Sequence, residues 1–245
     1  MILSQMKKGY APLALTALML SAMAVATPVQ AATWNAADDF SATTNPNGVW
    51  SYAGSNTGTF QFNNVEGGLL DAWHATQPGD LPYVAHNGTG ADQTVYTTVF
   101  VRDNELTMHP GSTGEKSEII FTAPTTGTYS VAADFFGQSK PGYQSTSTDV
   151  HVNINGTTFL FDDFVTTFQS GPSYSNAFLL LNAGDQLRFT VGYGPNNDYQ
   201  FDSTGFNAII SNATNPVPEP SAFAAFGVGI VLLGACFYRR RQVAA

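Results

Sequence analysis

Hydrophobic and polar positions alternate in short segments over most of the chain, and turn residues interrupt these segments at intervals of roughly 8–12 residues. In residues 127–136, an apolar or aromatic side chain recurs at every second position, which is the period of a strand buried on one face. Residues 150–154 and 157–161 flank Asn155-Gly156, a dipeptide that favours a two-residue hairpin turn. The pattern predicts an all-β domain, an antiparallel β-sandwich or jelly roll.

Further strands are expected where β-branched and aromatic residues gather. The segment up to residue 90 holds all three tryptophans, but its strand signals are weaker. No long segment of the domain has the period of an amphipathic helix, which favours the all-β interpretation. The other predicted strands are residues 94–101, 117–123, 177–181, 187–193 and 206–210.

The two ends of the chain depart from this pattern. Residues 11–26 are apolar and follow Lys7 and Lys8, and small residues lead up to Ala32. This arrangement is typical of a signal peptide that a signal peptidase removes by cleavage before Ala32. At the other end, residues 222–238 carry no charge and reach the length of about 17 residues that a membrane-spanning helix requires.

The C-terminal segment has three parts in a fixed order. Residues 217–220 read Val-Pro-Glu-Pro, the apolar run follows, and three arginines come after it. Arginines at one end of an apolar helix stay on the cytoplasmic side of the membrane. This order resembles the PEP-CTERM sorting signal, which implies that an exosortase cleaves near the Pro-Glu-Pro and discards the helix. The residues concerned are Pro218, Glu219 and Pro220 of the sorting motif and Arg239, Arg240 and Arg241 of the membrane stop.

Both ends therefore predict one route for the protein. We expect export, an anchor in the inner membrane before cleavage, and a final place at the cell surface or in the extracellular or biofilm matrix. Signal peptidase and exosortase are the expected processing partners. The predicted parts are a signal peptide (a signal helix) at 1–31, an exported β-sandwich domain at 32–213 and a sorting and anchor segment at 214–245, with a single transmembrane helix at 222–238.

Charge and cysteine content restrict the function of the exported domain. It carries seventeen acidic and four basic residues, a net charge of −13. Such a surface repels nucleic acid and anionic lipid, so neither is an expected partner, whereas divalent cations and neutral sugars suit it. The single cysteine, Cys236, lies in the apolar run, so the domain has no disulfide, no thiolate zinc site and no cysteine nucleophile.

Calcium is the one metal that the sequence suggests. Asp38 and Asp39 follow the start of the domain, and Asp198 and Asp202 precede its last strand. First and last strands of a sandwich are often neighbours, so these four carboxylates are expected to meet, and calcium takes oxygen ligands of this kind. The acidic turn Asp162-Asp163 is an alternative, and ordinary turn chemistry explains the same residues without any metal.

The turns of the domain also resemble a known class. Segments such as Thr122-Ala123-Pro124, Asn155-Gly156 and Ala183-Gly184-Asp185 are similar to those of exported jelly-roll domains of the carbohydrate-binding-module type. The resemblance implies a sandwich fold and sugar binding, for which exposed aromatic side chains are needed. The candidates in the most loop-like contexts are Tyr143 and Tyr174.

Signs of catalysis are few. Glycoside hydrolysis needs a close pair of carboxylates, which a domain this acidic supplies by chance. The four histidines, His74, His86, His109 and His151, follow no metal-binding or protease motif. We therefore expect a non-catalytic exported protein, not an enzyme, that binds or organises extracellular polysaccharide. A structural or adhesive matrix protein without glycan binding and a secreted polysaccharide hydrolase remain the alternatives.

Overall fold

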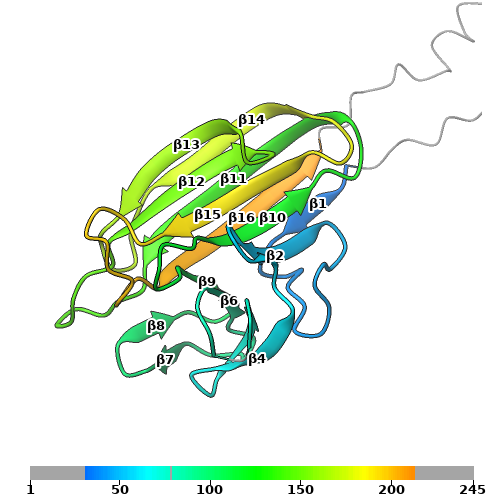
Figure 1. The fold of residues 1–245 in the computed structure, drawn as a ribbon. Coiled ribbons are helices and arrows are strands. Elements are labelled where there is room, and N and C mark those ends of the chain that lie inside the picture. Colours follow the sequence, from blue (N-terminus) through cyan, green and yellow to red (C-terminus); the bar gives the residue numbers. More distant parts are fainter. Residues whose placement is uncertain (1–30, 78, 213–245) are drawn as a thin grey trace, which may run out of the picture. The chain divides into compact units, whose positions relative to one another are not determined.

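The computed structural model describes residues 31–77 and 79–212 (Figure 1). Residues 31–213 form a compact unit of their own, and its described part is all-β. Among the described residues, no helix is long and apolar enough to cross a membrane. The predicted signal peptide, Ala31 apart, the sorting motif and the predicted transmembrane helix lie outside the described residues.

The larger sheet has eight strands, and the pairing of its named strands is antiparallel throughout. The first and last strands of the domain are neighbours in it, as predicted. In spatial order, its strands are β14 (Ser173–Leu181), β11 (Gly127–Gly137), β16 (Thr204–Asn212), β9 (Leu106–His109), β6 (Tyr83–His86), β5 (Leu70–His74) and β4 (Phe62–Glu66), with β1 (Thr33–Asn35) beside β16.

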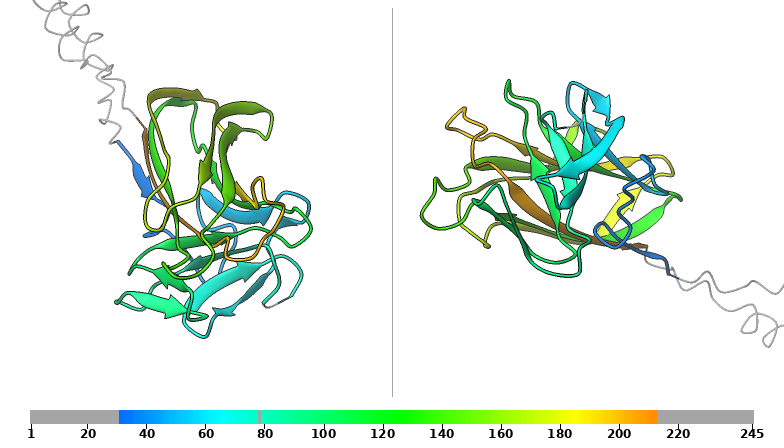
Figure 2. Two further views of the ribbon diagram at one scale, coloured as in Figure 1. Left: turned by 90° about the vertical axis from the view of Figure 1, so that its left-hand side faces the viewer. Right: turned by 90° about the horizontal axis from the view of Figure 1, so that it is seen from below.

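A second, six-stranded antiparallel sheet faces the first as the other layer of the sandwich (Figure 2). A separate two-stranded sheet, β7 (Gln93–Val95) with β8 (Val99–Val101), lies beside the β4–β6 end of the larger sheet (Figure 1). The six strands are β13 (Thr158–Val165), β12 (Thr148–Ile154), β15 (Gln186–Gly192), β10 (Ser117–Thr122), β2 (Trp50–Gly54) and β3 (Gly58–Thr59).

The main core fills the space between the two layers. In β11 the predicted alternation holds, since every second residue from Tyr129 to Phe135 is buried while Ser130, Ala132 and Asp134 between them are exposed. Phe206 of β16 joins the layers, because its ring centroid lies 5.1 Å from that of Phe135 and 5.0 Å from that of Phe189 in the opposite sheet. Burying one such side chain stabilises the fold by about 2 kcal/mol.

A smaller apolar cluster lies on the other face of the larger sheet. Leu70, Ala72, Tyr83 and Ala85 of β5 and β6 pack there against the valines of the β7–β8 hairpin, among them Val95. The strands β5 and β6 are therefore covered on both faces, by the sandwich core and by the hairpin. This second layer creates the hollow in which the candidate site lies.

The structure confirms most predicted strands and corrects one. The Asn155-Gly156 turn has both residues at positive φ and connects β12 to β13, as the dipeptide predicts. The single strand predicted at 94–101 is wrong: β7 and β8 are separated by a turn at 96–98, in which Tyr96 (φ 49°) and Thr97 (φ 62°) have left-handed backbones. Tyrosine and threonine favour strands, so composition gives no sign of this turn.

Candidate functional site

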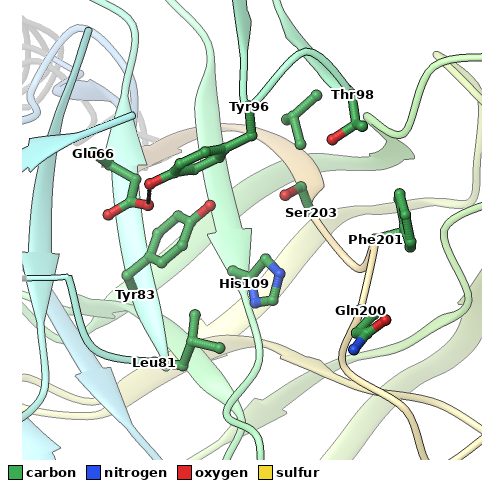
Figure 3. A pocket seen from close by; sticks show the side chains of 10 residues that line it. Glu66, Leu81, Tyr83, Tyr96, Thr98, His109, Gln200, Phe201 and Ser203 are labelled. Atoms are coloured by element: carbon green, nitrogen blue, oxygen red, sulfur yellow. Dashed lines mark hydrogen bonds between the residues drawn. The ribbon is translucent and has the colours of Figure 1, made fainter. Parts of the chain in front are cut away.

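A pocket of about 320 Å³ lies between the outer face of the larger sheet and the β7–β8 hairpin (Figure 3). This volume is at the lower end of the range of small-molecule sites. The lining residues come from β4, β6, β8 and β9, from the β7–β8 turn and from the segments that precede β6 and β16. They are Glu66, Leu81, Tyr83, Tyr96, Thr98, Val99, His109, Gln200, Phe201 and Ser203.

The floor of the pocket is part of a row of rings across three neighbouring strands. His74 of β5 is paired with Tyr83 of β6, and Tyr83 is paired with His109 of β9. Because paired residues project from the same face of a sheet, their rings stack side by side. The ring centroids of Tyr83 and His109 lie 5.3 Å apart at an angle of 26°, and those of His74 and Tyr83 lie 5.7 Å apart.

Tyr96 forms the roof on the hairpin side. Its phenolic hydroxyl donates a hydrogen bond to the carboxylate of Glu66, which is itself buried at the end of β4. The same hydroxyl accepts a hydrogen bond of 3.1 Å from the backbone N–H of Gly67. Tyr96 as a whole is still 59% exposed although it lines the pocket, so it lies at the pocket mouth.

Phe201 forms the opposite wall, on the segment that leads into β16, and also has a left-handed backbone (φ 64°). Figure 3 shows Glu66 and Tyr96 on one side of the hollow and Phe201 on the other. Asp202, next in the chain, is fully buried and accepts hydrogen bonds from Ser147, 2.9 Å from its backbone nitrogen and 3.2 Å from its hydroxyl. This contact fixes the segment that carries Phe201.

Backbone strain is concentrated at this pocket. Seven non-glycine residues of the described part have positive φ, and three of them are asparagines, which tolerate this conformation. Tyr96, Thr97 and Phe201 are aromatic or β-branched, and for such residues a left-handed backbone is a costly exception. Tyr96 and Phe201 line the pocket, and Thr97 lies in the same turn, between the lining residues Tyr96 and Thr98. Residues held in this way cluster at functional sites.

Burial also shifts the pKa values of titratable side chains in the pocket. Burial lowers the pKa of His109 to about 4, against the effect of its contact with the carbonyl of Pro110, so the ring is neutral near pH 7. Burial, together with the hydrogen bond to Glu66, raises the pKa of Tyr96 to about 12, and burial raises the pKa of Tyr83 well above its usual range. The pocket therefore offers neutral rings around the carboxylate of Glu66.

The two predicted tyrosines have different surroundings. Tyr143 is 47% exposed, and its ring stacks on that of Phe201 with centroids 6.4 Å apart, so it extends the pocket wall outward. Tyr174 lies in β14 and is only 8% exposed. Its ring packs against that of Phe161, and the loop position expected for it is therefore wrong.

The structure does not bring the four predicted calcium ligands together. Asp39 accepts hydrogen bonds from the backbone N–H of Asn35 and the indole of Trp50, and Asp38 accepts one from Asn104. Although β1 is beside β16, the chain leaves this pairing near Ala208, whereas Asp202 lies six residues earlier. At about 3.3 Å per residue, the two ends of this stretch are separated by roughly 20 Å.

Calcium binding by these residues stays a prediction. Across 31–77 and 79–212, no three His, Cys, Asp or Glu side chains are grouped as metal ligands. The alternative pair, Asp162-Asp163, lies in β13 and not in a turn. There Asp162 is directed at His151, with 3.2 Å between its Oδ1 and Nδ1 of the ring.

That contact belongs to a second group of ionisable side chains, on the outer face of the six-stranded sheet. Oδ2 of Asp149 lies 2.7 Å from Nζ of Lys116 and 2.6 Å from Nε2 of His151. Nζ of Lys116 in turn lies 2.6 Å from Nε2 of His151. His151 faces away from the sandwich core, as the alternation predicts, but its neighbours largely cover it.

Sequence reasoning did not single out Glu66, Tyr96, Phe201 or Ser203 as site residues. They come from distant parts of the chain, and only the sheet order unites them. One signal was present for Phe201, because Tyr199 and Phe201 are aromatic residues in an otherwise polar Asn- and Asp-rich segment. No such signal marks Glu66.

Comparison with known proteins identifies a sorting motif near the end of the chain. Residues 216–242 match the family model described as the PEP-CTERM protein-sorting motif. The chain therefore carries this motif where the sequence predicted it, and the motif indicates a protein that is exported and sorted to the cell surface by an exosortase. No curated protein matches the chain.

Similar solved structures include carbohydrate-binding modules and glycoside hydrolases. A CBM51 from Clostridium perfringens GH95, in complex with methyl-galactose, is 10% identical, with 74% of this chain and all of that chain covered and a TM-score of 0.35. A family 35 module from Clostridium thermocellum is 14% identical (50% and 87% covered, TM-score 0.31). A Podospora anserina GH26-CBM35 β-(1,4)-mannanase is 17% identical (TM-score 0.30); 56% of this chain is covered, but only 28% of the mannanase.

Proposed function

We propose that this protein is a non-catalytic surface or matrix protein that binds extracellular polysaccharide through the pocket beneath the β7–β8 hairpin. Signal peptidase and exosortase would release it from the inner membrane to that location. The observation that carries the proposal is the placement of Tyr96 and Phe201, two aromatic residues held by strained turns on opposite sides of one hollow. If these positions served only to connect strands, glycine or asparagine would be expected there, because both tolerate a positive φ.

The chemistry of the pocket suits a sugar. Pyranose rings present C–H faces that pack on aromatic rings, and hydroxyl groups that need hydrogen-bond partners. Rings are supplied by Tyr83, Tyr96 and Phe201. Polar groups lie on both sides of the hollow, with the carboxylate of Glu66 beside Tyr96 and the amide of Gln200 on the side of Phe201 (Figure 3).

A binding role is favoured over hydrolysis by the carboxylate content of the pocket. Retaining and inverting glycosidases commonly use two carboxylates that flank the bond to be cleaved. Among the lining residues, Glu66 is the one acidic side chain, and it is already hydrogen-bonded to Tyr96. This supports the proposal that the protein holds a glycan without cleaving it.

A glycan array with the full chain tests the proposal. The chain should be purified in a zwitterionic detergent, because a detergent with a sugar headgroup would compete for the pocket. We expect binding that falls at least about tenfold in Tyr96→Ala and Phe201→Ala, as loss of an aromatic stacking contact predicts. Phe164→Ala, which removes an exposed ring of β13 on the other sheet, is the matched control and should bind normally. An array without any bound glycan would refute the proposal.

Self-association is a second candidate function, favoured by the outermost strand of the larger sheet. β14 is the last strand on its side, and it contains no charged residue although the domain has a net charge of −13. It exposes Phe178 (80%) and Leu180 (75%), and an open, uncharged edge strand is a template for pairing with another copy. Sedimentation equilibrium of the wild type and of Phe178→Ser/Leu180→Ser tests this, since only the wild type should associate.

A further inference from the structure

We infer that the pocket prefers a sugar with a free ammonium group, a hexosamine unit without its acetyl group, over a neutral sugar or a uronate. The inference rests on the proposed function and specifies the ligand of the same site. Its basis is the combination of one carboxylate with several aromatic faces in a single small hollow. Each of these elements attracts a cation, and neither attracts an anion.

Among the described residues, no lysine or arginine side chain lines the pocket to pair with the carboxylate of Glu66. Oε1 of this carboxylate accepts the hydroxyl of Tyr96, which is a neutral donor. Oε2 lies 3.6 Å from Nε2 of His74, beyond hydrogen-bond distance. Because a buried carboxylate gains much from a nearby positive charge, the pocket offers a large electrostatic advantage to a ligand that brings one.

His74 makes no hydrogen bond to this carboxylate. Its Nδ1 lies 2.9 Å from the backbone carbonyl of Asp80, an acceptor only, so the ring proton is assigned to Nδ1. Nε2 then has a lone pair and no hydrogen-bond partner, and it is directed at Glu66 without donating to it. The carboxylate thus stays free to pair with a ligand.

Three of the four lysine and arginine residues of the described domain form ion pairs outside the pocket. Lys116 contacts Asp149, Arg188 contacts Glu118, and Arg102 contacts Glu105 in ion pairs outside the pocket. Lys140 lies nearer, since its backbone N–H donates to the carbonyl of Thr98, but its side chain is not part of the pocket lining. A uronate would therefore meet Glu66 without any guanidinium or ammonium group to bind it.

The rings complete a cation site. An ammonium group over the face of a tyrosine or phenylalanine gains about 0.5–2 kcal/mol, more where water is excluded. Tyr83, Tyr96 and Phe201 present such faces around the hollow, and His109 adds a neutral ring and no positive charge. An ammonium group between Glu66 and these rings would have favourable contacts on several sides.

Three tetrasaccharides of one backbone test the inference. Their β-1,4-linked glucose units differ only at C2, which carries a hydroxyl, an acetamido group or an ammonium group, and a tetra-uronate is the acidic comparison. Calorimetry with the full chain at about pH 6 keeps the amine largely protonated and His109 neutral. We expect the ammonium compound to bind about tenfold more tightly than the hydroxyl compound, with a preference that salt weakens.

A substitution of Glu66 tests whether its charge, and not the shape of its side chain, determines the preference. Glu66→Gln keeps an oxygen for the hydroxyl of Tyr96 and should reduce the affinity for the ammonium compound to that for the hydroxyl compound. The salt dependence of the wild type tests the same point without any variant. Equal binding of the C2 series, or tighter binding of the uronate, would overturn the inference but leave the proposed function intact. Failure of every compound and of the glycan array would overturn both.

Discussion

The hydroxyl of Tyr96 donates a hydrogen bond to the carboxylate of Glu66, thirty residues away in the chain. This bond ties the tip of the β7–β8 hairpin to the end of β4, so the hairpin covers the sheet instead of standing away from it. It also places the ring of Tyr96 over the hollow that Phe201 closes on the other side. This long-range hydrogen bond and the packing of the hairpin valines on β5 and β6 together hold the hairpin over the sheet.

Removing the Tyr96 hydroxyl should separate the two roles of this residue. Tyr96→Phe keeps the ring but loses the hydrogen bond to Glu66, which should lower the free energy of unfolding by about 1 kcal/mol. Glycan affinity should fall only a few fold, because the aromatic face remains. Urea unfolding and calorimetry measure the two effects. If Tyr96→Phe lost as much affinity as Tyr96→Ala, the ring could not be the main contact.

At the strained turn, we expect a substitution that raises the free energy of unfolding. Thr97 has a left-handed backbone (φ 62°), which costs a residue with a β-carbon about 1–2 kcal/mol and glycine almost nothing. After the greater entropy of glycine in the unfolded state is taken into account, Thr97→Gly should stabilise the protein by up to about 1 kcal/mol. Thr94→Gly in β7 is the control and should destabilise it, as glycine does in a strand. Urea unfolding of both variants decides the point.

Sequence pattern predicted the sandwich well because its signals are local. In β11 the exposed and buried faces alternate residue by residue, and at Asn155-Gly156 the turn type follows directly from two side chains. Each of these features requires only neighbours in the chain, so the sequence alone contains the necessary information.

The candidate site could not be predicted in the same way. Tyr96 and Thr97 have strand-favouring side chains, and the contact that holds them in a turn is to Glu66, in a different strand. The structure does not bring the predicted calcium ligands together, for a related reason. The whole of β1 pairs with the C-terminal part of β16, whereas Asp202 lies just before the N-terminal end of β16, so Asp39 and Asp202 are far apart along the strand.

Asp202 should make the protein less stable as the pH rises. Burial raises its pKa to about 7, although hydrogen bonds from Ser147 act against this rise. Between about pH 4 and 7 the folded state therefore holds a proton that the unfolded state has lost, and stability decreases as pH increases through this range. Asp202→Asn has no such proton and should flatten this slope. At pH 8 its free energy of unfolding should exceed that of the wild type by about 2 kcal/mol. Denaturant unfolding across the pH range measures the slope, and identical slopes would contradict the assignment.

Asp149 should show the opposite dependence on pH. Burial alone would raise its pKa, but contacts with His151 and Lys116 outweigh burial and hold this pKa well below its usual range. Its contribution to stability is therefore complete above about pH 4, the unfolded pKa, and is lost as the pH falls through the lower folded value.

Asp149→Asn tests this contribution directly. At pH 7 it should cost about 2 kcal/mol, because Lys116 and His151 lose the charged partner that they share. The difference from the wild type should shrink below about pH 4, where the wild-type carboxylate also begins to protonate. Asp163→Asn, in the neighbouring strand and exposed, is a matched control that should change stability by less than about 0.5 kcal/mol. A cost for Asp149→Asn that stays constant down to pH 3 would show that packing, and not charge, supplies the stabilisation.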